Sequence, residues 1–430
     1  MLRYEGREEF FGSIFYDFKN KDFLAFDKKY TAMLKHGEFE RLDGAFQTTA
    51  KDIELIKDNG TPNYSFIKTV PLKDLLSAPL RLHLAYTAAC NLRCAHCLAG
   101  GYVGNVPNEL TFKEKIGVYE QMTSLGIHEI LIGGGEPFIK KDFVAFLKEG
   151  EKRRINQKVF TNGLLLDDDI IDQIKDIQLG YLSISLDGAC DKSYYEVRHV
   201  NKFDQVVDTC KKISKKVHFP VVIQTTATKA NMGEVEALLE VAAETGVSKI
   251  KIRPLKPGGS ILNHPNLMLS ADEYLGFIKR AQEVWNVKYK NKFKLDYSWG
   301  NVRLFFDDCE DRILIDQIPQ PHTGYGCLAG KISTFIDPFG KTYPCVFLDT
   351  YIKLHDEENI RKHKLIDIWK NGQTFNFLRN LKSNSTCQKC GYYASCRGGC
   401  IARILYAKQR INGQDPWCLN KYFPMKTKQV

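Results

Sequence analysis

The feature that most constrains this chain is a regular alternation of two textures between residues 81 and 254. Short runs rich in β-branched and aromatic residues are typical of buried strands, and the stretches between them have the period of amphipathic helices. This alternation predicts an α/β fold with a parallel sheet inside helices, whose ligands bind at the carboxyl ends of the strands. Six runs are too few for a closed eight-stranded barrel, so we expect a partial, open (β/α)6 barrel of the TIM type. The runs are residues 81–86, 128–133, 158–162, 181–187, 221–227 and 249–254.

Thirteen cysteines stand in clusters along the 430 residues. The first residues, MLRYEGREEFFG, lack the apolar stretch of a secretory signal, so we expect a cytoplasmic protein with reduced thiols. Clustered thiols then indicate metal sites rather than a disulfide framework. No apolar run is long enough to cross a membrane. The net charge of +10 suits solubility, an acidic peptide partner or weak nucleic-acid contact without selecting among them, and we expect no nucleic-acid partner.

A cysteine triplet comes directly after the first strand-like run, as Cys90, Cys94 and Cys97 in the segment CNLRCAHC. Three thiolates at these spacings can bind three corners of one [4Fe–4S] cluster and leave the fourth iron open for chemistry. A zinc site is the alternative, and it would need a fourth protein ligand. His96 is the nearest candidate, but it is adjacent to Cys97 and would chelate poorly with it.

The CX3CX2C triplet, placed after the first strand of a β/α chain, resembles the radical S-adenosylmethionine (SAM) superfamily. The resemblance implies that the three thiolates hold a catalytic cluster whose open iron binds the amino and carboxylate groups of SAM. Reductive cleavage of SAM would then yield a 5′-deoxyadenosyl radical. His96 stands where the family usually has an aromatic residue that packs on the adenine, and the alternative is a loop histidine in solvent.

Two further segments resemble family elements at the ends of the second and third strands. Gly134, Gly135 and Glu136 belong to GGGEP, which resembles the element whose main-chain carbonyls bind the SAM ammonium. Glycines suit this role because they let the backbone come close to a ligand. The alternative is an ordinary tight turn. The segment TNG, residues 161–163, ends the third strand.

The fourth strand ends in SISLDG, where alternation points Ser183, Ser185 and Asp187 to one face. The family places that face beside the ribose and methionine of SAM, so the resemblance implies contacts from Ser185 and Asp187. Arg198 in YYEVRH resembles the arginine that pairs with the SAM carboxylate, a role that suits a bidentate guanidinium. Arg253 ends the sixth strand and has a looser claim to the same site.

Eight of the thirteen cysteines lie between residues 287 and 430, where the periodicity is weak. We expect a small, loop-rich domain there that metal binding stabilises. The segment ISTFIDPFGKTYP predicts a hairpin with a type I turn at residues 337–340, which would bring the cysteines on either side together. Seven cysteines have a spacing that resembles the SPASM domain of peptide-modifying radical SAM enzymes, namely Cys327, Cys345, Cys387, Cys390, Cys396, Cys400 and Cys418.

The SPASM resemblance implies two auxiliary iron–sulfur clusters. One would be bound by Cys387, Cys390, Cys396 and Cys418. The other would be bound by Cys327, Cys345 and Cys400, with Cys309 as the candidate for a fourth ligand. A zinc ribbon in CQKCGYYASCRGGC is the alternative, but it would leave the distant cysteines without a purpose. Cys190 and Cys210 fit no pattern, and we expect them to be ordinary buried thiols.

The first eighty residues do not continue the regular alternation of strand-like and helical stretches. GSIFYDFKNKDFLAFD predicts a hairpin around residues 19–21, and helical stretches follow near 28–36 and 50–58. This layout resembles the winged-helix-like leader-recognition domain of enzymes that mature ribosomal peptides, which implies that a precursor peptide adds a strand at the sheet edge. A lid or a dimerisation arm is the alternative. We therefore expect three domains, for leader recognition (1–75), the radical SAM core (80–290) and the SPASM domain (300–430).

Together these resemblances imply an oxidoreductase that modifies a ribosomal precursor peptide, with a layout similar to that of sactipeptide and ranthipeptide thioether synthases. The radical would abstract a Cα or Cβ hydrogen, and a thioether or carbon–carbon cross-link would form oxidatively. A reductant such as flavodoxin or ferredoxin would supply electrons. The alternatives are a haem-pathway radical SAM enzyme, a multi-cluster electron carrier, and a sulfatase-maturase type of enzyme, which has an aspartate where this chain has Val346.

Overall fold

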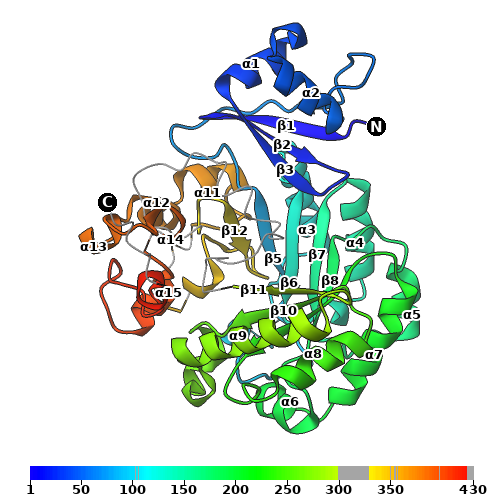
Figure 1. Ribbon diagram of the computed structural model, residues 1–430, viewed down its shortest axis with the longest axis vertical. Coiled ribbons are helices and arrows are strands. Elements are labelled where there is room, and N and C mark those ends of the chain that lie inside the picture. The colour runs from blue at the N-terminus through cyan, green and yellow to red at the C-terminus, as the bar shows by residue number, and fades with distance from the viewer. Residues whose placement is uncertain are drawn as a thin grey trace.

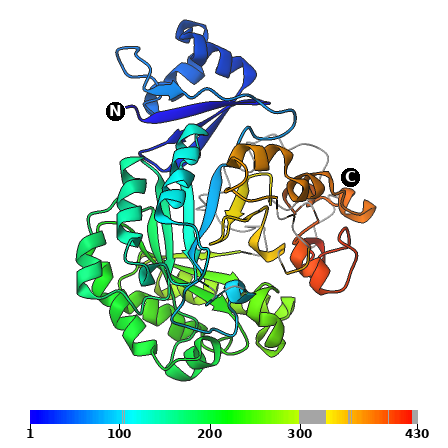
Figure 2. The ribbon, with the colours of Figure 1, turned by 180° about the vertical axis from the view of Figure 1, so that it is seen from behind.

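The computed structural model describes residues 1–101, 103, 104, 106–298, 329–348, 350–352, 355, 357–396 and 398–423. A small N-terminal sheet, a large α/β barrel and a C-terminal region of short helices follow one another along the chain (Figure 1). Figure 2 shows from behind that helices line the outside of the barrel, whereas the C-terminal region lies at its open side. The predicted α/β class is therefore confirmed.

The N-terminal sheet has the strand order β3-β2-β1-β4. Its first three strands are antiparallel neighbours, and β4 is parallel to β1. The strands are β1 (Tyr4–Glu9), β2 (Gly12–Asp17), β3 (Asp22–Asp27) and β4 (Tyr64–Phe66). Two helices, α1 (Lys28–His36) and α2 (Gly44–Asp52), pack on this sheet. The order leaves β3 as an edge strand, paired on one side only within the described residues.

The prediction for the second helix of this region was wrong in position. We expected it near residues 50–58, but α2 ends at Asp52 because the chain turns away there and Glu54 adopts a φ of +59°. The overlooked signal is Asp43, whose carboxylate accepts a hydrogen bond from the backbone N–H of Phe46 and so caps the helix start.

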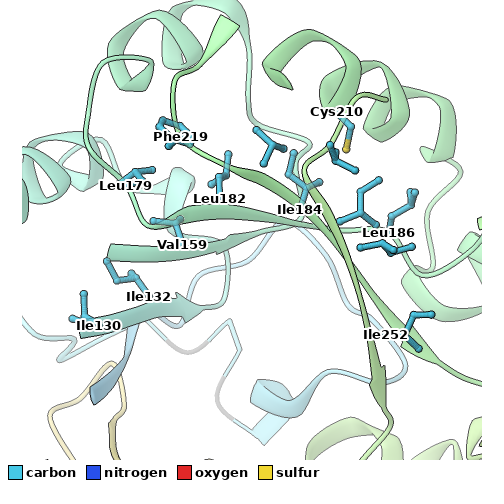
Figure 3. Packing of buried hydrophobic residues seen from close by; sticks show 14 of the residues in the cluster. Ile130, Ile132, Val159, Leu179, Leu182, Ile184, Leu186, Cys210, Phe219 and Ile252 are labelled. Atoms are coloured by element: carbon cyan, nitrogen blue, oxygen red, sulfur yellow. The ribbon is translucent and has the colours of Figure 1, made fainter. Parts of the chain in front are cut away.

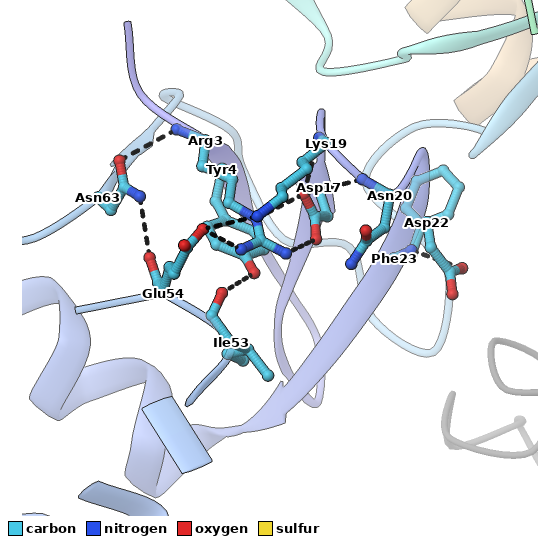
Figure 4. Close-up of polar contacts among 10 residues, drawn as sticks. All are labelled: Arg3, Tyr4, Asp17, Lys19, Asn20, Asp22, Phe23, Ile53, Glu54 and Asn63. Carbon is cyan, nitrogen blue, oxygen red and sulfur yellow. Dashed lines mark hydrogen bonds and ion pairs between the residues drawn. The ribbon is translucent and has the colours of Figure 1, made fainter. Parts of the chain in front are cut away.

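The predicted hairpin of the N-terminal sheet is confirmed, and Asp17 stabilises it. Its carboxylate accepts hydrogen bonds from the backbone N–H groups of Lys19 and Asn20, at 2.8 and 3.3 Å, and so closes the turn between β2 and β3. The same carboxylate accepts hydrogen bonds from Nε and Nη2 of Arg3, at 3.0 and 2.7 Å (Figure 4). Arg3 also contacts Glu54, so one guanidinium ties the hairpin to the segment after α2.

The barrel sheet contains the six predicted strands as parallel neighbours and extends them to nine strands in the described part of the chain. The predicted six are β5 (Arg81–Thr87), β6 (Glu129–Gly134), β7 (Asn156–Thr161), β8 (Tyr181–Ser185), β9 (Val221–Ala227) and β10 (Lys249–Pro254). The helices around them are α3 (Phe112–Ser124), α4 (Phe143–Lys152), α5 (Asp168–Ile174), α6 (Asp191–Arg198), α7 (Phe203–Lys216), α8 (Val235–Glu244) and α9 (Ala271–Lys288).

The core of the barrel lies between the outer face of the sheet and the helices. Leu182 and Ile184 of β8 are fully buried there, as are Cys210 and Ile213 of α7 (Figure 3). Each fully buried side chain of this size contributes roughly 1.5–3 kcal/mol through removal of apolar surface from water. Because strand side chains alternate between faces, the residues between these apolar ones, such as Ser183, point into the barrel instead.

Two additions complete the sheet at its edges. At one edge, β11 (Lys294–Tyr297) pairs in parallel with β10. At the other, β12 (Ser333–Ile336) pairs in parallel with β5 and forms a hairpin with β13 (Thr342–Tyr343). The hairpin was predicted from its turn, in which the Asp337 carboxylate accepts hydrogen bonds from two backbone N–H groups and Gly340 has a φ of +86°. Its addition to the barrel sheet was not predicted.

The C-terminal region consists of short helices around small apolar clusters. Trp369 is fully buried there, and its indole N–H donates to the carbonyl of Leu76 at 2.8 Å. The helices are α11 (Leu365–Asn371), α12 (Gln373–Asn380), α13 (Ser385–Gln388), α14 (Tyr393–Cys396), α15 (Ile401–Tyr406) and α16 (Leu419–Tyr422).

The N-terminal sheet docks on the barrel at the end where the strands begin. Arg7 is buried in this contact and donates hydrogen bonds to the carbonyls of residues 78 and 79, before β5, and of residues 125 and 126, before β6. Its charge is balanced by Glu9, at 2.8 Å, which also accepts two hydrogen bonds from Ser77. Phe18 of the hairpin lies beneath the guanidinium of Arg154, ahead of β7.

Replacement of Arg7 by methionine should destabilise the protein by about 3–5 kcal/mol, because it leaves the Glu9 carboxylate buried without its counter-charge. Urea-induced unfolding followed by circular dichroism measures the change. Arg41→Met is the matched control, since the Arg41–Glu38 pair is exposed and should contribute less than about 1 kcal/mol. Equal effects of the two substitutions would contradict this account of the interface.

Candidate active site

A cavity of about 740 Å³ opens at the carboxyl ends of the barrel strands and continues into the barrel. Its mouth is lined by Cys90, Cys94, His96 and Cys97 from the loop after β5, and by the glycines after β6. Side chains that point inward from the strands form its walls. The cavity therefore lies where parallel α/β folds bind ligands.

The loop after β5 brings the three predicted cysteines to one cavity. The loop is anchored by hydrogen bonds from Ala95 N to the Val197 carbonyl at 2.9 Å and from Cys97 N to the Cys94 carbonyl at 3.2 Å. Burial raises the pKa of the Cys90 thiol and raises that of Cys97 to about 11. A bound metal would offset this cost, because it stabilises the thiolate form of its ligands.

Three thiols on one short loop, open toward a large cavity, fit a [4Fe–4S] cluster that keeps one iron free for another ligand. In the described part of the chain, no three His, Cys, Asp or Glu side chains lie close enough to share a single metal ion.

The carboxylate of Asp187, just after β8, is the centre of a buried polar network beside this loop. It accepts hydrogen bonds from Arg198 Nε at 2.7 Å and from the Thr226 backbone N–H at 2.6 Å, and it lies 3.1 Å from His96 Nε2. Burial alone would raise the pKa of Asp187, but Arg198 and His96 hold it well below its usual range. Arg198 also reaches the Cys94 sulfur at 3.6 Å.

This network places three predicted SAM-contacting residues together, but it gives them protein partners. His96 and Arg198 both bind Asp187, which is fully buried, so its carboxylate faces these two side chains rather than the open cavity. Ser185, two residues earlier, lines the cavity itself. The sequence did not reveal Thr226 and Asn231 as partners of Asp187, and Asn231 donates to its carbonyl at 2.9 Å.

The GGGEP segment packs against the backbone just ahead of the cysteine loop. Gly135 N and Glu136 N donate to the carbonyls of Thr87 and Ala89, at 2.7 and 2.8 Å. A Cβ at Gly135 would lie 2.1 Å from the Ala89 oxygen, and Gly134 adopts a φ of +117°, so both positions require glycine. The three glycines, residues 133–135, line the cavity.

Glu136 is buried beside the cavity rather than exposed in it. Its carboxylate accepts hydrogen bonds from Asn162 N at 2.7 Å, Thr161 Oγ1 at 2.9 Å and Phe138 N at 3.2 Å. Burial raises its pKa to about 7 despite these donors. Glu136 therefore joins the ends of β6 and β7, and the segment TNG takes part through these contacts.

A second, smaller cavity lies in the C-terminal region. It is lined by the four cysteines predicted to hold one auxiliary cluster, Cys387, Cys390, Cys396 and Cys418. Burial raises the pKa of Cys387 and raises that of Cys396 to about 12, so these thiols are also poised to gain from a metal. Four thiols around one hollow fit a four-cysteine iron–sulfur cluster.

Only part of the other predicted cluster can be located. Cys309 and Cys327 lie outside the described residues, whereas Cys345 is half-buried and Cys400 is buried. The backbone N–H of Cys400 donates to Asp415 at 2.7 Å, and Asp415 forms a buried ion pair with Arg403 at 2.6 Å.

The prediction of two ordinary buried thiols was right for one and wrong for the other. Cys210 is fully buried in the barrel core, whereas Cys190 is exposed at the start of α6, 3.4 Å from a Glu234 oxygen. Cys190 precedes the helix in a loop, and the apolar face of α6 begins after it.

Comparison with known families identifies the two cysteine-bearing parts. A model of the radical SAM superfamily matches residues 84–242, and a model of the SPASM iron–sulfur cluster-binding domain matches residues 327–391. The chain carries a radical SAM domain and a SPASM domain. SAM and iron–sulfur clusters are therefore its cofactors, and the predicted partial barrel with a C-terminal SPASM domain is confirmed.

Relatives of this radical SAM/SPASM chain span most of its length. Mycofactocin maturase MftC of Mycobacterium tuberculosis is 25% identical over 354 residues, which cover 80% of this chain and 84% of MftC. AdoMet-dependent heme synthase of Methanosarcina barkeri is 27% identical over 353 residues, which cover 80% of this chain and 97% of the synthase.

The fold of Streptococcus suis SuiB, in a crystal structure with the precursor peptide SuiA bound, matches with a TM-score of 0.73 at 17% identity. This match covers 97% of the present chain and 98% of SuiB, so it takes in the N-terminal sheet as well as the barrel. Within the described residues of our radical SAM/SPASM chain, no helix combines the length and apolar composition that a membrane crossing requires.

Replacement of Asp187 by asparagine should destabilise the protein by about 3–5 kcal/mol, because it leaves Arg198 buried without a counter-charge. The folded pKa of Asp187 lies below the unfolded value, so its contribution is fully present above about pH 4 and is lost as the pH falls through the folded pKa. The loss should therefore persist from pH 6 to 8 in anaerobic urea titrations.

The matched control is Asp168→Asn, whose carboxylate is exposed and pairs with two surface lysines. It should change the free energy of unfolding by less than about 1 kcal/mol. A loss for Asp187→Asn that is no larger than this, or that vanishes within pH 6–8, would contradict the role of the network.

Proposed function

We propose that the chain is a peptide maturase that uses radical SAM chemistry to cross-link a ribosomal precursor peptide. The observation that carries this proposal is the N-terminal sheet, which has an open edge strand, is docked on the barrel, and belongs to a layout shared with a structure solved with its precursor peptide. The cavity of about 740 Å³ has room for both SAM and a peptide segment.

Cys90, Cys94 and Cys97 are assigned to the catalytic [4Fe–4S] cluster, which supplies the electron that cleaves SAM to methionine and a 5′-deoxyadenosyl radical. The predicted SAM contacts fall into two groups, those that can touch SAM directly from the cavity wall and those that also bind neighbouring protein groups. Backbone atoms of Gly134 and Gly135 and the side chain of Ser185 line the cavity and can touch SAM directly. The other predicted contacts are His96, Glu136, Asp187 and Arg198.

Among these four, Asp187 and Glu136 position their neighbours. Asp187 orients His96 and Arg198, which both line the cavity, so these two can present a ring and a guanidinium to SAM while they remain bound to the carboxylate. Glu136 ties the ends of β6 and β7 together. The chain therefore holds the walls of the site rigid before any ligand enters.

The C-terminal region is assigned to two auxiliary clusters. Cys387, Cys390, Cys396 and Cys418 would hold one. Cys345 and Cys400 would hold the other, together with Cys327 and with Cys309 as a candidate fourth ligand. Cross-link formation after hydrogen abstraction is oxidative, so these clusters would accept an electron. The catalytic cluster would need one electron from a reductant such as a cytoplasmic flavodoxin or ferredoxin, whereas the auxiliary clusters would pass on the electron that they accept.

The N-terminal sheet, within residues 1–75, is assigned to the leader of the precursor. Because β3 is an edge strand, its outer backbone groups can pair with an added peptide strand. The core of the precursor would enter the radical SAM core (80–290), beside the SPASM domain (300–430). A thioether is our preferred product and a carbon–carbon cross-link the next.

The reaction class is tested by SAM cleavage. Reconstituted, dithionite-reduced protein should release methionine and 5′-deoxyadenosine, detected by liquid chromatography. Substitution of Cys90, Cys94 and Cys97 by alanine should abolish release and remove about four irons per chain, the content of one cubane cluster. Cys190→Ala is the matched control, since this exposed thiol lies outside both cysteine-lined cavities. Release by the triple variant would refute the assignment.

The leader assignment is tested by hydrogen exchange on the full chain. A candidate precursor, encoded beside the gene, should slow amide exchange within residues 22–27, because an added strand would pair with the outer edge of β3, which has no strand neighbour among the described residues. Helix α8 on the far side of the barrel is the internal control and should be unchanged. Protection elsewhere with none in β3 would remove the edge-strand assignment.

A further inference from the structure

The interior of the barrel is strongly cationic. Lysine and arginine outnumber aspartate and glutamate eight to two among the residues that line the large cavity. The cations include Lys158 on β7, Lys249, Lys251 and Arg253 on β10, and Lys294 on β11. A concave, low-dielectric wall lined by one sign of charge concentrates ligands of the opposite sign.

Both acidic side chains of the wall already have cationic partners. Glu129 pairs with Lys158 at 2.7 Å and with Arg81 at 3.1 Å. Asp296 receives two hydrogen bonds from Arg253, at 3.1 and 2.8 Å. Arg198 pairs with Asp187, so Arg81, Lys158, Arg198 and Arg253 each have a carboxylate partner.

Lys251 differs from these four paired cations. It is only 5% exposed, it lines the cavity, and its ammonium has no carboxylate or hydrogen-bond partner among the described residues. Its Nζ lies 3.6 Å from the centre of the Tyr181 ring. A buried lysine without a partner is costly to keep charged, so such a residue indicates a functional position.

The surroundings of Lys251 favour its neutral form until an anion arrives. Burial, together with the charges of Arg253, Lys249 and Lys158, lowers its pKa to about 6, and Asp296 offsets only part of this effect. The groups that face it are Lys158, Tyr181, Lys249, Arg253 and Asp296, together with the neutral Gln224 on β9. A carboxylate placed against Nζ would favour the protonated form, so binding would take up a proton.

The strand register places Lys251 near the predicted SAM contacts. Gln224 on β9 is the register partner of both Lys251 on β10 and Ser185 on β8. The three side chains all line the cavity, and Ser185 ends its strand beside the Asp187 network. An anionic group bound at Lys251 would thus lie inside the barrel, below the site assigned to SAM.

We propose that Lys251 binds a carboxylate of the substrate, an aspartate or glutamate side chain close in sequence to the residue that loses hydrogen. This inference rests on the proposed peptide-maturase function and adds a requirement for acidic character in the modified segment. Lys251 acts as a specificity-determining residue, because a neutral amide in the same place would not stabilise the protonated form of its side chain.

The test compares two capped probes, acetyl-Gly-Glu-Gly-amide and acetyl-Gly-Gln-Gly-amide, by isothermal titration calorimetry against the reconstituted, SAM-loaded protein. Wild-type protein should bind the glutamate probe about tenfold more tightly or better, as expected for a desolvated charge pair. Titrations at pH 7.5 in buffers of different ionisation enthalpy should show uptake of about one proton per bound glutamate probe.

Three variants make the test specific. Lys251→Met should bind both probes equally, and Lys251→Arg should keep the preference without proton uptake, since arginine stays charged. Lys249→Met is the matched control, two residues earlier on the same face of β10, and it should keep the preference. Thermal melting checks that each variant is folded, and the methionine variant should melt no lower than wild type because methionine buries no polar amine.

The outcomes separate this inference from the function on which it rests. Equal or absent binding of the two probes by wild-type protein overturns the inference, as does an equal loss of preference in Lys249→Met and Lys251→Met. If the wild-type protein also fails to cleave SAM, the proposed function fails as well. If it cleaves SAM and does not discriminate between the probes, only the role of Lys251 is lost.

Discussion

The geometry of the site depends on one buried carboxylate. Asp187 accepts hydrogen bonds from β9 and α6 and binds His96 in the cysteine loop, so one side chain joins three segments that are far apart in the sequence. A carboxylate in such surroundings costs several kcal/mol unless it is paired, and Arg198 provides the pairing. The same guanidinium reaches the Cys94 sulfur. Arg198 therefore both neutralises the charge of Asp187 and helps to position the Cys94 thiol.

Side chains of the barrel strands alternate between an apolar outer face and a polar face that lines the cavity. Outward residues of β8, such as Ile184, are apolar and pack on helices, whereas inward residues, such as Ser185, face the cavity. On β10 the inward positions are cationic, so stability is supplied by the outer layer and ligand recognition by the inner one. This division lets the interior carry many cationic side chains while the apolar outer layer stabilises the fold.

Much of this arrangement could be predicted from the sequence, because the signals are local. Strand and helix alternation predicted β5 to β10, and the cysteine triplet and GGGEP marked the mouth of the cavity. The partners of Asp187 could not be predicted, because Thr226 and Asn231 meet it only through the tertiary fold. The pairing of β12 with β5 joins residues about 250 positions apart, which no local pattern encodes. Lys251 had a signal that was missed, since KIKIRP places three cations on one face of a strand.

The N-terminal sheet contacts the barrel through the segments that precede β5, β6 and β7, whereas the cysteine loop follows β5 at the other end. A precursor anchored on β3 must therefore extend past the whole depth of the barrel before it meets the thiols. Strands of six or seven residues span about 20 Å at roughly 3.3 Å per residue. Under the leader assignment proposed above, the leader and the first modified residue would be separated by at least about six extended residues, so the depth of the barrel would set a minimum spacing along the peptide.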